Sequence, residues 1–156
     1  MKSKQAGFTL VEIAIVLVII GLLLGGVLKG QELINSAKVK NFATDFRNIP
    51  LLVYGYQDKF RALPGDDPAA STHVAGATNA TTPATCGGGS SVCTGNGKLD
   101  GFWDTSTATD ETFVFWQQVR LANLASGPTD LTGATRDTFF PKNAEGGIIG
   151  IEWGGE

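Results

Sequence analysis

One carboxylate, Glu12, lies inside an apolar run that extends from Phe8 to Leu28. A charged side chain near the middle of a bilayer costs at least ~2.5 kcal/mol, so an acidic residue in such a run requires a reason to be there. Pairing the carboxylate with a buried ammonium group relieves both charges. The residue types therefore favour a charge-pairing role for Glu12. The alternative is a plain membrane anchor, in which Glu12 lies near the interface and snorkels or takes up a proton.

The apolar run has the length of a membrane span. It contains 21 residues, in which Thr9 and Glu12 are the strongly polar ones. At ~1.5 Å per residue, a helix of this length matches the hydrocarbon thickness of a bilayer. Lys2 and Lys4 precede the run without any acidic residue. The positive-inside rule then holds the N-terminus in the cytoplasm and places the chain beyond Leu28 outside it.

The start of the run carries a processing signal. A secretory signal peptide is cut after its apolar core, at small residues, but here the core leads into Lys29 without such a site. The small residue is instead Gly7, ahead of the core. The sequence GFTLVE, from Gly7 to Glu12, closely resembles the processing site of type IV prepilins and of the pseudopilins of type II secretion systems.

This resemblance implies a maturation pathway. A prepilin peptidase at the membrane would cut between Gly7 and Phe8 and methylate the new amino group of Phe8. Glu12 would then meet the Phe8 ammonium of a neighbouring subunit as a filament assembles from an inner-membrane platform. The implied fold is pilin-like, α+β, with a long N-terminal helix, residues 8–60, packed on a small globular head.

The residue pattern beyond the membrane run predicts the same long helix. Apolar residues recur at alternating spacings of three and four, which is typical of an amphipathic helix that packs on a soluble domain. These residues are Val39, Phe42, Phe46, Ile49, Val53, Tyr56 and Phe60. The helix as a whole would measure roughly 80 Å at 1.5 Å per residue. Its glycines at 21, 25 and 26 are either a soft point or places where neighbouring helices approach closely, and Pro50 is a possible bend.

The chain divides into predicted segments by these patterns. Residues 1–7 form a leader, 8–28 the membrane and filament-core helix, 29–62 the amphipathic spine, and 63–156 a single head with a long loop at 64–104. Asp110 to Ala125 reads as a second helix, stopped by Gly127 and Pro128. Residues 138–141 and 147–153 are the strand candidates, so the small antiparallel sheet is predicted to be minimal or to need a neighbour.

The head loop contains the remaining candidates for chemistry. Cys86 and Cys93 are the only two cysteines, and outside the cytoplasm they are predicted to form a disulfide across a glycine-rich loop. The single histidine, His73, is interpreted as a solvated loop residue.

Four oxygen-bearing residues of this loop are candidate calcium ligands, namely Asp66, Asp67, Asn96 and Asp100. Lys98 stands at an alternate position where it cannot coordinate, and residue 107 is Thr rather than a bidentate Glu. Ordinary Asx turns are the alternative interpretation of these residues. No other cofactor is expected.

Composition argues against other functions. There is one histidine, no nucleophile elbow and no phosphate loop, so an enzyme is not expected. Removal of Lys2 and Lys4 leaves 10 basic against 15 acidic side chains, a net charge of −5, and there is no basic patch, which disfavours nucleic acid as the main partner. The sequence predicts a filament subunit that starts in the inner membrane with a periplasmic head. The alternative is an anchored module that binds a ligand, a surface or calcium through the 64–104 loop.

Overall fold

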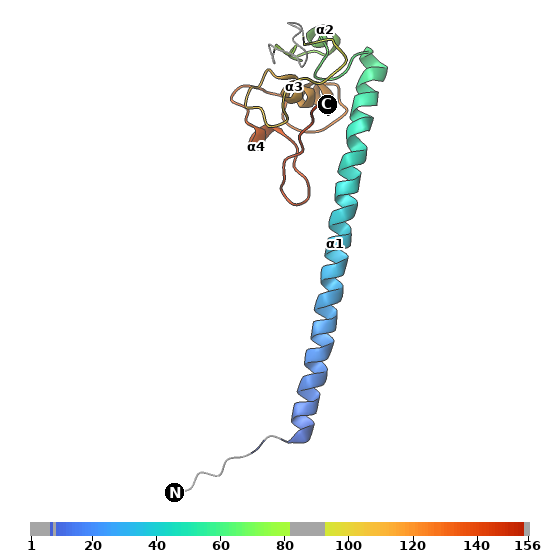
Figure 1. Cartoon of the computed structure of the whole chain (residues 1–156), viewed down its shortest axis with the longest axis vertical. Coiled ribbons are helices and arrows are strands. Elements are labelled where there is room, and N and C mark those ends of the chain that lie inside the picture. Colours follow the sequence, from blue (N-terminus) through green and yellow to red (C-terminus); the bar gives the residue numbers. More distant parts are fainter. Residues whose placement is uncertain (1–6, 8, 82–92, 155–156) are drawn as a thin grey trace. The chain divides into compact units, whose positions relative to one another are not determined.

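The structure, a computed structural model, describes residue 7, residues 9–81 and residues 93–154. In chain order its helices are α1 (Leu10–Phe60), α2 (Ala70–His73), α3 (Glu111–Leu121) and α4 (Arg136–Phe139) (Figure 1). The chain forms two compact units, Met1–Lys40 and Asn41–Glu156, and α1 passes from the first into the second.

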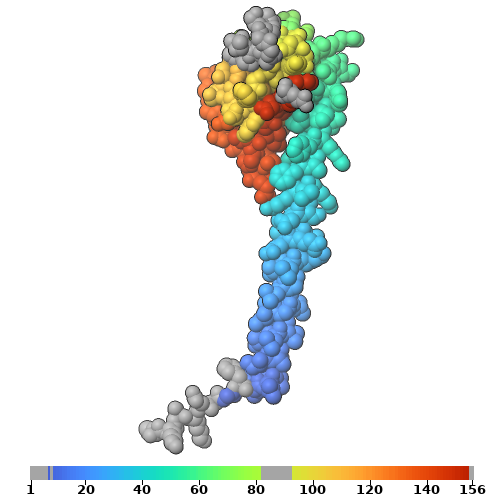
Figure 2. Space-filling view, viewed as in Figure 1, coloured from blue at the N-terminus to red at the C-terminus, as the bar shows by residue number. Residues whose placement is uncertain are grey.

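The first unit confirms the predicted long apolar helix. Its large apolar side chains, from Leu10 to Leu28, are all exposed (Figure 2). Within the described chain, α1 is the helix long and apolar enough to cross a membrane, by length and composition. The helix runs without interruption through Gly25 and Gly26, and a Cβ at either position would have open space within 4 Å. It also continues past Pro50.

Helix α1 ends where the sequence predicts. Arg61 has a φ of 57°, a left-handed conformation that stops the helix, and its N–H donates to the carbonyl of Gln57 at 2.8 Å. Left-handed residues with this backward hydrogen bond commonly cap helices. Pro64 follows and cannot continue a helix, so the chain turns into the head at this point.

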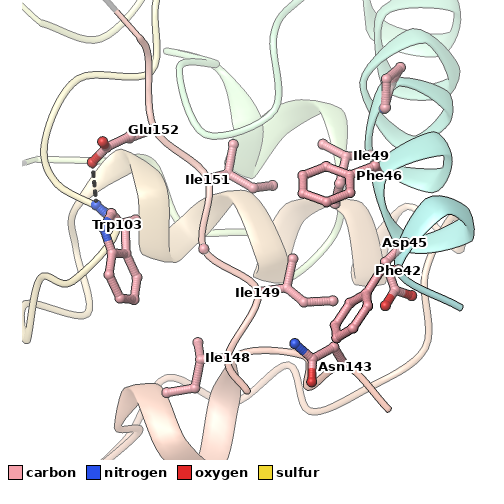
Figure 3. A pocket seen from close by; sticks show the side chains of 12 residues that line it. Phe42, Asp45, Phe46, Ile49, Trp103, Asn143, Ile148, Ile149, Ile151 and Glu152 are labelled. Atoms are coloured by element: carbon pink, nitrogen blue, oxygen red, sulfur yellow. Dashed lines mark hydrogen bonds between the residues drawn. The ribbon is translucent and has the colours of Figure 1, made fainter. Parts of the chain in front are cut away.

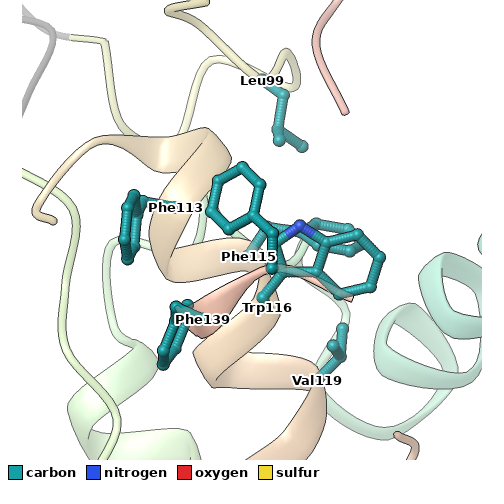
Figure 4. Packing of buried hydrophobic residues seen from close by; sticks show 7 residues of the cluster. Leu99, Phe113, Phe115, Trp116, Val119 and Phe139 are labelled. Atoms are coloured by element: carbon teal, nitrogen blue, oxygen red, sulfur yellow. The ribbon is translucent and has the colours of Figure 1, made fainter. Parts of the chain in front are cut away.

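Helix α3 forms the centre of the head. Every residue from Glu111 to Arg120 is buried, so the helix is covered on all sides by loops and by α1. Phe113 stacks on Phe139 with ring centroids 5.1 Å apart, and Phe115 meets Trp116 edge-on (Figure 4). The predicted second helix is therefore confirmed as a core helix. It is shorter than expected and ends at Leu121.

Two glutamines of α3 hold the loops onto the core. Gln118 accepts the N–H of Gly65 at 2.6 Å and donates to the carbonyl of Thr78, while Gln117 accepts the N–H of Thr78. Gly65 has a φ of +88°, and a Cβ there would lie 2.6 Å from the carbonyl oxygen of Glu111. Only glycine therefore allows the loop to approach α3 this closely. Side chains supply the hydrogen bonds that a sheet would otherwise give these loops.

The predicted antiparallel sheet is not found among the described residues. There the β pairing consists of one isolated antiparallel bridge, between Lys142 and Ile148. The strand predicted at 138–141 is wrong, because Arg136–Phe139 forms the short helix α4. Thr135 and Thr138 form a capping box that starts this turn, and Pro141 has no N–H to donate to a ladder.

The predicted spine stripe is only partly buried. From Ile49 onward it packs as expected, with Tyr56 wholly buried and Phe60 against the same cluster. Before Ile49 the burial is incomplete, because Phe42 is half-buried, Val39 remains 66% exposed and Phe46 78% exposed. Within the second unit, the loops of the head pack on the last turns of α1 and leave Phe46 uncovered.

Candidate functional site

The first turn of α1 is built around Thr9 and Glu12. The carboxylate of Glu12 accepts hydrogen bonds from the Thr9 N–H at 2.8 Å and from the Thr9 hydroxyl at 2.7 Å. In return, the Glu12 N–H donates to the Thr9 hydroxyl oxygen at 3.3 Å. These reciprocal bonds form a capping box that satisfies backbone donors at the start of the helix. Within this chain, the Glu12 side chain thus caps the terminus of its own helix.

This cap was missed from the sequence, although its signal is present. Thr followed three residues later by Glu, just before an apolar run, is the usual pattern of a capping box. The cap leaves room for the predicted ion pair, since an ionised carboxylate offers about four lone-pair sites. Gly7 is exposed beside this turn, and Phe8 lies outside the described residues. The cleavage, the methylation and the contact of Glu12 with a neighbour stay predictions.

A second polar group joins α1 to the head at Asp67. Its wholly buried carboxylate accepts the hydroxyl of Tyr56 at 2.8 Å and lies 2.7 Å from Nδ1 of His73. The N–H of Ala69 donates to its other oxygen at 2.9 Å. Burial, with the adjacent carboxylate, raises the pKa of Tyr56, so the phenol stays protonated and donates. Asp67 therefore links the end of α1 to the α2 segment.

The interpretation of His73 as a solvated loop residue is right about its exposure and wrong about the loop, because the exposed His73 belongs to helix α2. It ends helix α2, and its ring stacks on Phe60 with centroids 5.7 Å apart, in addition to its contact with Asp67. No local sequence pattern indicates these contacts, because Phe60, Asp67 and His73 lie in different parts of the fold. Their meeting depends on the turn at Gly65, which brings α2 back against α1.

Asp66 organises the turn that precedes Leu99. Its carboxylate accepts the N–H groups of Gly95, of Asn96 at 3.2 Å and of Gly97 at 2.7 Å. Burial raises the pKa of Asp66 even though these three donors favour the charged form. One carboxylate thus closes the loop between the two ends of the 64–104 region.

Glu111 is a buried acid in the first turn of α3. Its side chain is wholly buried, and its carboxylate accepts the N–H of Asp100 at 2.7 Å. Burial, reinforced by the charges of Asp66 and Asp100, raises the pKa of Glu111 to about 8. Near neutral pH this side chain is therefore mostly protonated.

The raised pKa of Glu111 predicts that the stability of the head depends on pH. Below about pH 4.5 the residue is protonated in both the folded and the unfolded chain, whereas between pH 4.5 and 8 only the folded chain keeps the proton. Stability therefore falls as pH rises through this window and levels off above it. We expect Glu111→Gln to raise the free energy of unfolding at pH 8 by about 2 kcal/mol and to flatten the profile.

The measurement is denaturant unfolding of the full chain in detergent and a metal chelator, followed by tryptophan fluorescence between pH 5 and 8. Asp104→Asn, which removes an exposed carboxylate, serves as the matched control and should leave the profile unchanged. Parallel pH profiles for the wild type and Glu111→Gln would contradict the prediction.

The predicted metal and disulfide sites stay predictions. Among the described residues, no three His, Cys, Asp or Glu side chains are grouped so that they could hold a metal ion. Asp66 and Asp67 accept hydrogen bonds from the protein, and the Asn96 amide donates to Asp100 at 2.6 Å. Cys86 lies outside the described residues, so its pairing with the buried Cys93 is not tested.

Comparison with known proteins identifies the N-terminal segment. Residues 2–28 match the family model of the prokaryotic N-terminal methylation motif, the motif of type IV pilin and pseudopilin precursors. No curated protein and no solved structure matches the chain. The match confirms the resemblance found at Gly7 to Glu12. It covers the leader and the apolar start of α1 and leaves the head to be understood from its own structure.

Proposed function

We propose that this chain is a structural subunit of a type IV pilus-like filament or of a type II secretion pseudopilus. The observation that carries the proposal is the methylation motif at residues 2–28, which leads into the N-terminal part of α1, where the large apolar side chains from Leu10 to Leu28 are all exposed. A surface of this kind is stable only in lipid or against similar helices. The membrane would cover it before assembly, and other copies of α1 would cover it in the filament.

The proposed pathway follows from the motif. Prepilin peptidase removes residues 1–7 and methylates Phe8, while the chain is held in the inner membrane with its N-terminus cytoplasmic and its head periplasmic. An assembly platform in that membrane then moves the subunit into a periplasmic or surface filament, where Glu12 meets the Phe8 ammonium of a neighbour. Repeated head-to-tail contacts that do not close into a ring produce such open filaments.

The alternative of an anchored binding module is less well supported. The motif belongs to a family of structural subunits. In the 64–104 loop, Asp66 and Asp67 are engaged by hydrogen bonds that hold the loop to the rest of the head. These contacts assign the two carboxylates a structural role. A calcium ion could add to that role without changing the proposed function.

Mass spectrometry of sheared filaments tests the proposal. We expect the chain in the filament fraction, lacking residues 1–7 and carrying one methyl group on the amino group of Phe8. Gly7→Leu places a bulky side chain at the cut and should leave the full-length precursor in the membrane. Absence of the chain from filaments, or its presence there with the leader attached, would overturn the proposal.

A further inference from the structure

An apolar groove of about 620 Å³ lies in the second unit, beside the uncovered part of the spine stripe (Figure 3). One wall is the α1 segment, and the opposite wall is the C-terminal stretch from Ile148 to Glu152. In Figure 3, Ile149 and Ile151 point toward the α1 wall. The principal apolar lining residues are Phe42, Phe46, Ile49, Trp103, Ile149 and Ile151.

The groove is open to solvent at its α1 wall, where Phe46 lies. Phe46 is 78% exposed, although it belongs to the same periodic stripe as the buried Tyr56. Covering a large apolar side chain removes apolar surface from water and stabilises a complex, so Phe46 is an available anchor for an apolar partner. A partner that fills the groove would complete the stripe that the head itself leaves uncovered.

The C-terminal wall also presents an unpaired backbone edge. The N–H of Ile149 donates to the Pro141 carbonyl at 2.9 Å, and the N–H of Asn143 donates to the Gly147 carbonyl at 2.8 Å. These bonds flank the Lys142–Ile148 bridge, so residues 147 and 149 face residues 141–143, and the backbone groups of Ile148 face away from them. From the alternation of an extended chain, we expect the backbone groups of residues 150 and 152 on the same side as those of Ile148. In the described structure, none of them takes part in a hydrogen bond with another backbone group.

The free backbone edge and the acidic side chains that line the groove indicate what kind of partner would fit it. An extended segment can pair with a free backbone edge and place alternate side chains into a groove, whereas a helix has already satisfied its own backbone. Among the described residues, the lining includes the carboxylates of Asp45 and Glu152 and no Lys, Arg or His. The complementary partner is thus an extended apolar segment that carries a basic residue.

We infer that this groove receives an extended apolar segment with a Lys or Arg, supplied by a neighbouring subunit of the filament, which pairs with residues 148, 150 and 152 as an added strand. The inference rests on the proposed function, because the filament brings the neighbour to the groove. The added segment would also give the head a paired strand, of which the described residues contain only the Lys142–Ile148 bridge. Assembly and completion of the head then become one event.

Residue-resolved hydrogen exchange tests the strand directly, comparing the full chain in assembled filaments with the same chain dispersed in detergent. Pairing predicts at least tenfold slower exchange in filaments for the amides of Ile148, Gly150 and Glu152, with a smaller change at Ile151. Unchanged exchange at the even-numbered amides would overturn the inference. Equal slowing at Ile151 would do so too, because it would indicate simple burial under a helix.

A matched pair of variants separates the backbone from the side chain at residue 152. Both Glu152→Pro and Glu152→Ala remove the carboxylate that accepts the Trp103 N–H at 3.1 Å, but only the proline variant also removes the edge N–H. We expect filament incorporation of Glu152→Pro to be at least fivefold lower than that of Glu152→Ala. Equal incorporation would argue against a paired strand.

A second pair tests the groove through exposed aromatic residues of α1. Phe46→Ala should lower incorporation several-fold, whereas Tyr54→Ala, at a 67% exposed residue outside the groove, should not. Equal effects of the two substitutions would count against the groove. If wild-type filaments form but the even-numbered amides stay unprotected, the inference fails while the proposed function stands. If the wild-type chain never enters filaments, the proposed function itself fails.

Discussion

Filament incorporation is expected to fall at least tenfold when Glu12 is replaced by Gln. The substitution removes the charge that would pair with the Phe8 ammonium of a neighbour, and an unpaired ammonium in an apolar bundle is strongly penalised. Gln is also a capping-box residue, so the hydrogen bonds between residue 12 and Thr9 can be kept. The measurement is the ratio of the chain in sheared filaments to the chain in membranes, by quantitative immunoblot.

Two further variants separate the charge of Glu12 from its cap. Glu12→Ala removes both the charge and the cap, and it should be as defective in assembly as Glu12→Gln. Thr9→Val removes the capping hydroxyl but keeps the charge of Glu12, so this variant should assemble far better than the two Glu12 variants. Leader removal is measured in each strain, so that a processing failure is not mistaken for an assembly failure. If Glu12→Gln enters filaments as the wild type does, Glu12 serves the helix terminus and the ion-pair hypothesis is wrong.

The features that were predicted correctly from the sequence have local signals. The processing motif is a contiguous run from Gly7 to Glu12, and α1 follows from apolar composition and helical spacing. The start of α3 follows from Asp110 and Glu111 ahead of regularly spaced aromatic residues. In each case neighbouring residues along the chain determine the structure, and the tertiary fold does not override them.

The parts that were not predicted depend on contacts between distant residues. The 64–81 loop is held by Gln117 and Gln118 rather than by a ladder, so its shape carries no periodic pattern. Whether the stripe of α1 is covered at Phe46 depends on where the head loops pack, which helical spacing does not specify. The apolar period correctly indicated the face of α1. It did not indicate which length of that face the chain itself would bury.

Loss of the Asp67 carboxylate is expected to have the largest effect on the stability of the head. Asp67→Ala leaves the buried Tyr56 hydroxyl without its acceptor, removes the partner of His73, and opens a cavity at the junction of α1 and α2. Breaking a buried polar network of this kind costs about 3 kcal/mol. We expect that decrease in the free energy of unfolding, measured on the full chain in detergent by the near-ultraviolet signal of the head tryptophans.

A double-mutant cycle distinguishes this network from the general cost of a core substitution. Tyr56→Phe removes one donor while Asp67 keeps its contacts with His73 and Ala69, so it should cost about 1 kcal/mol. In the double variant the hydroxyl is absent, and the loss should be smaller than the sum of the two single losses. Strict additivity would mean that the two side chains do not stabilise each other. A loss below ~0.5 kcal/mol for Asp67→Ala would mean that packing around α3, and not the buried carboxylate, holds the head to α1.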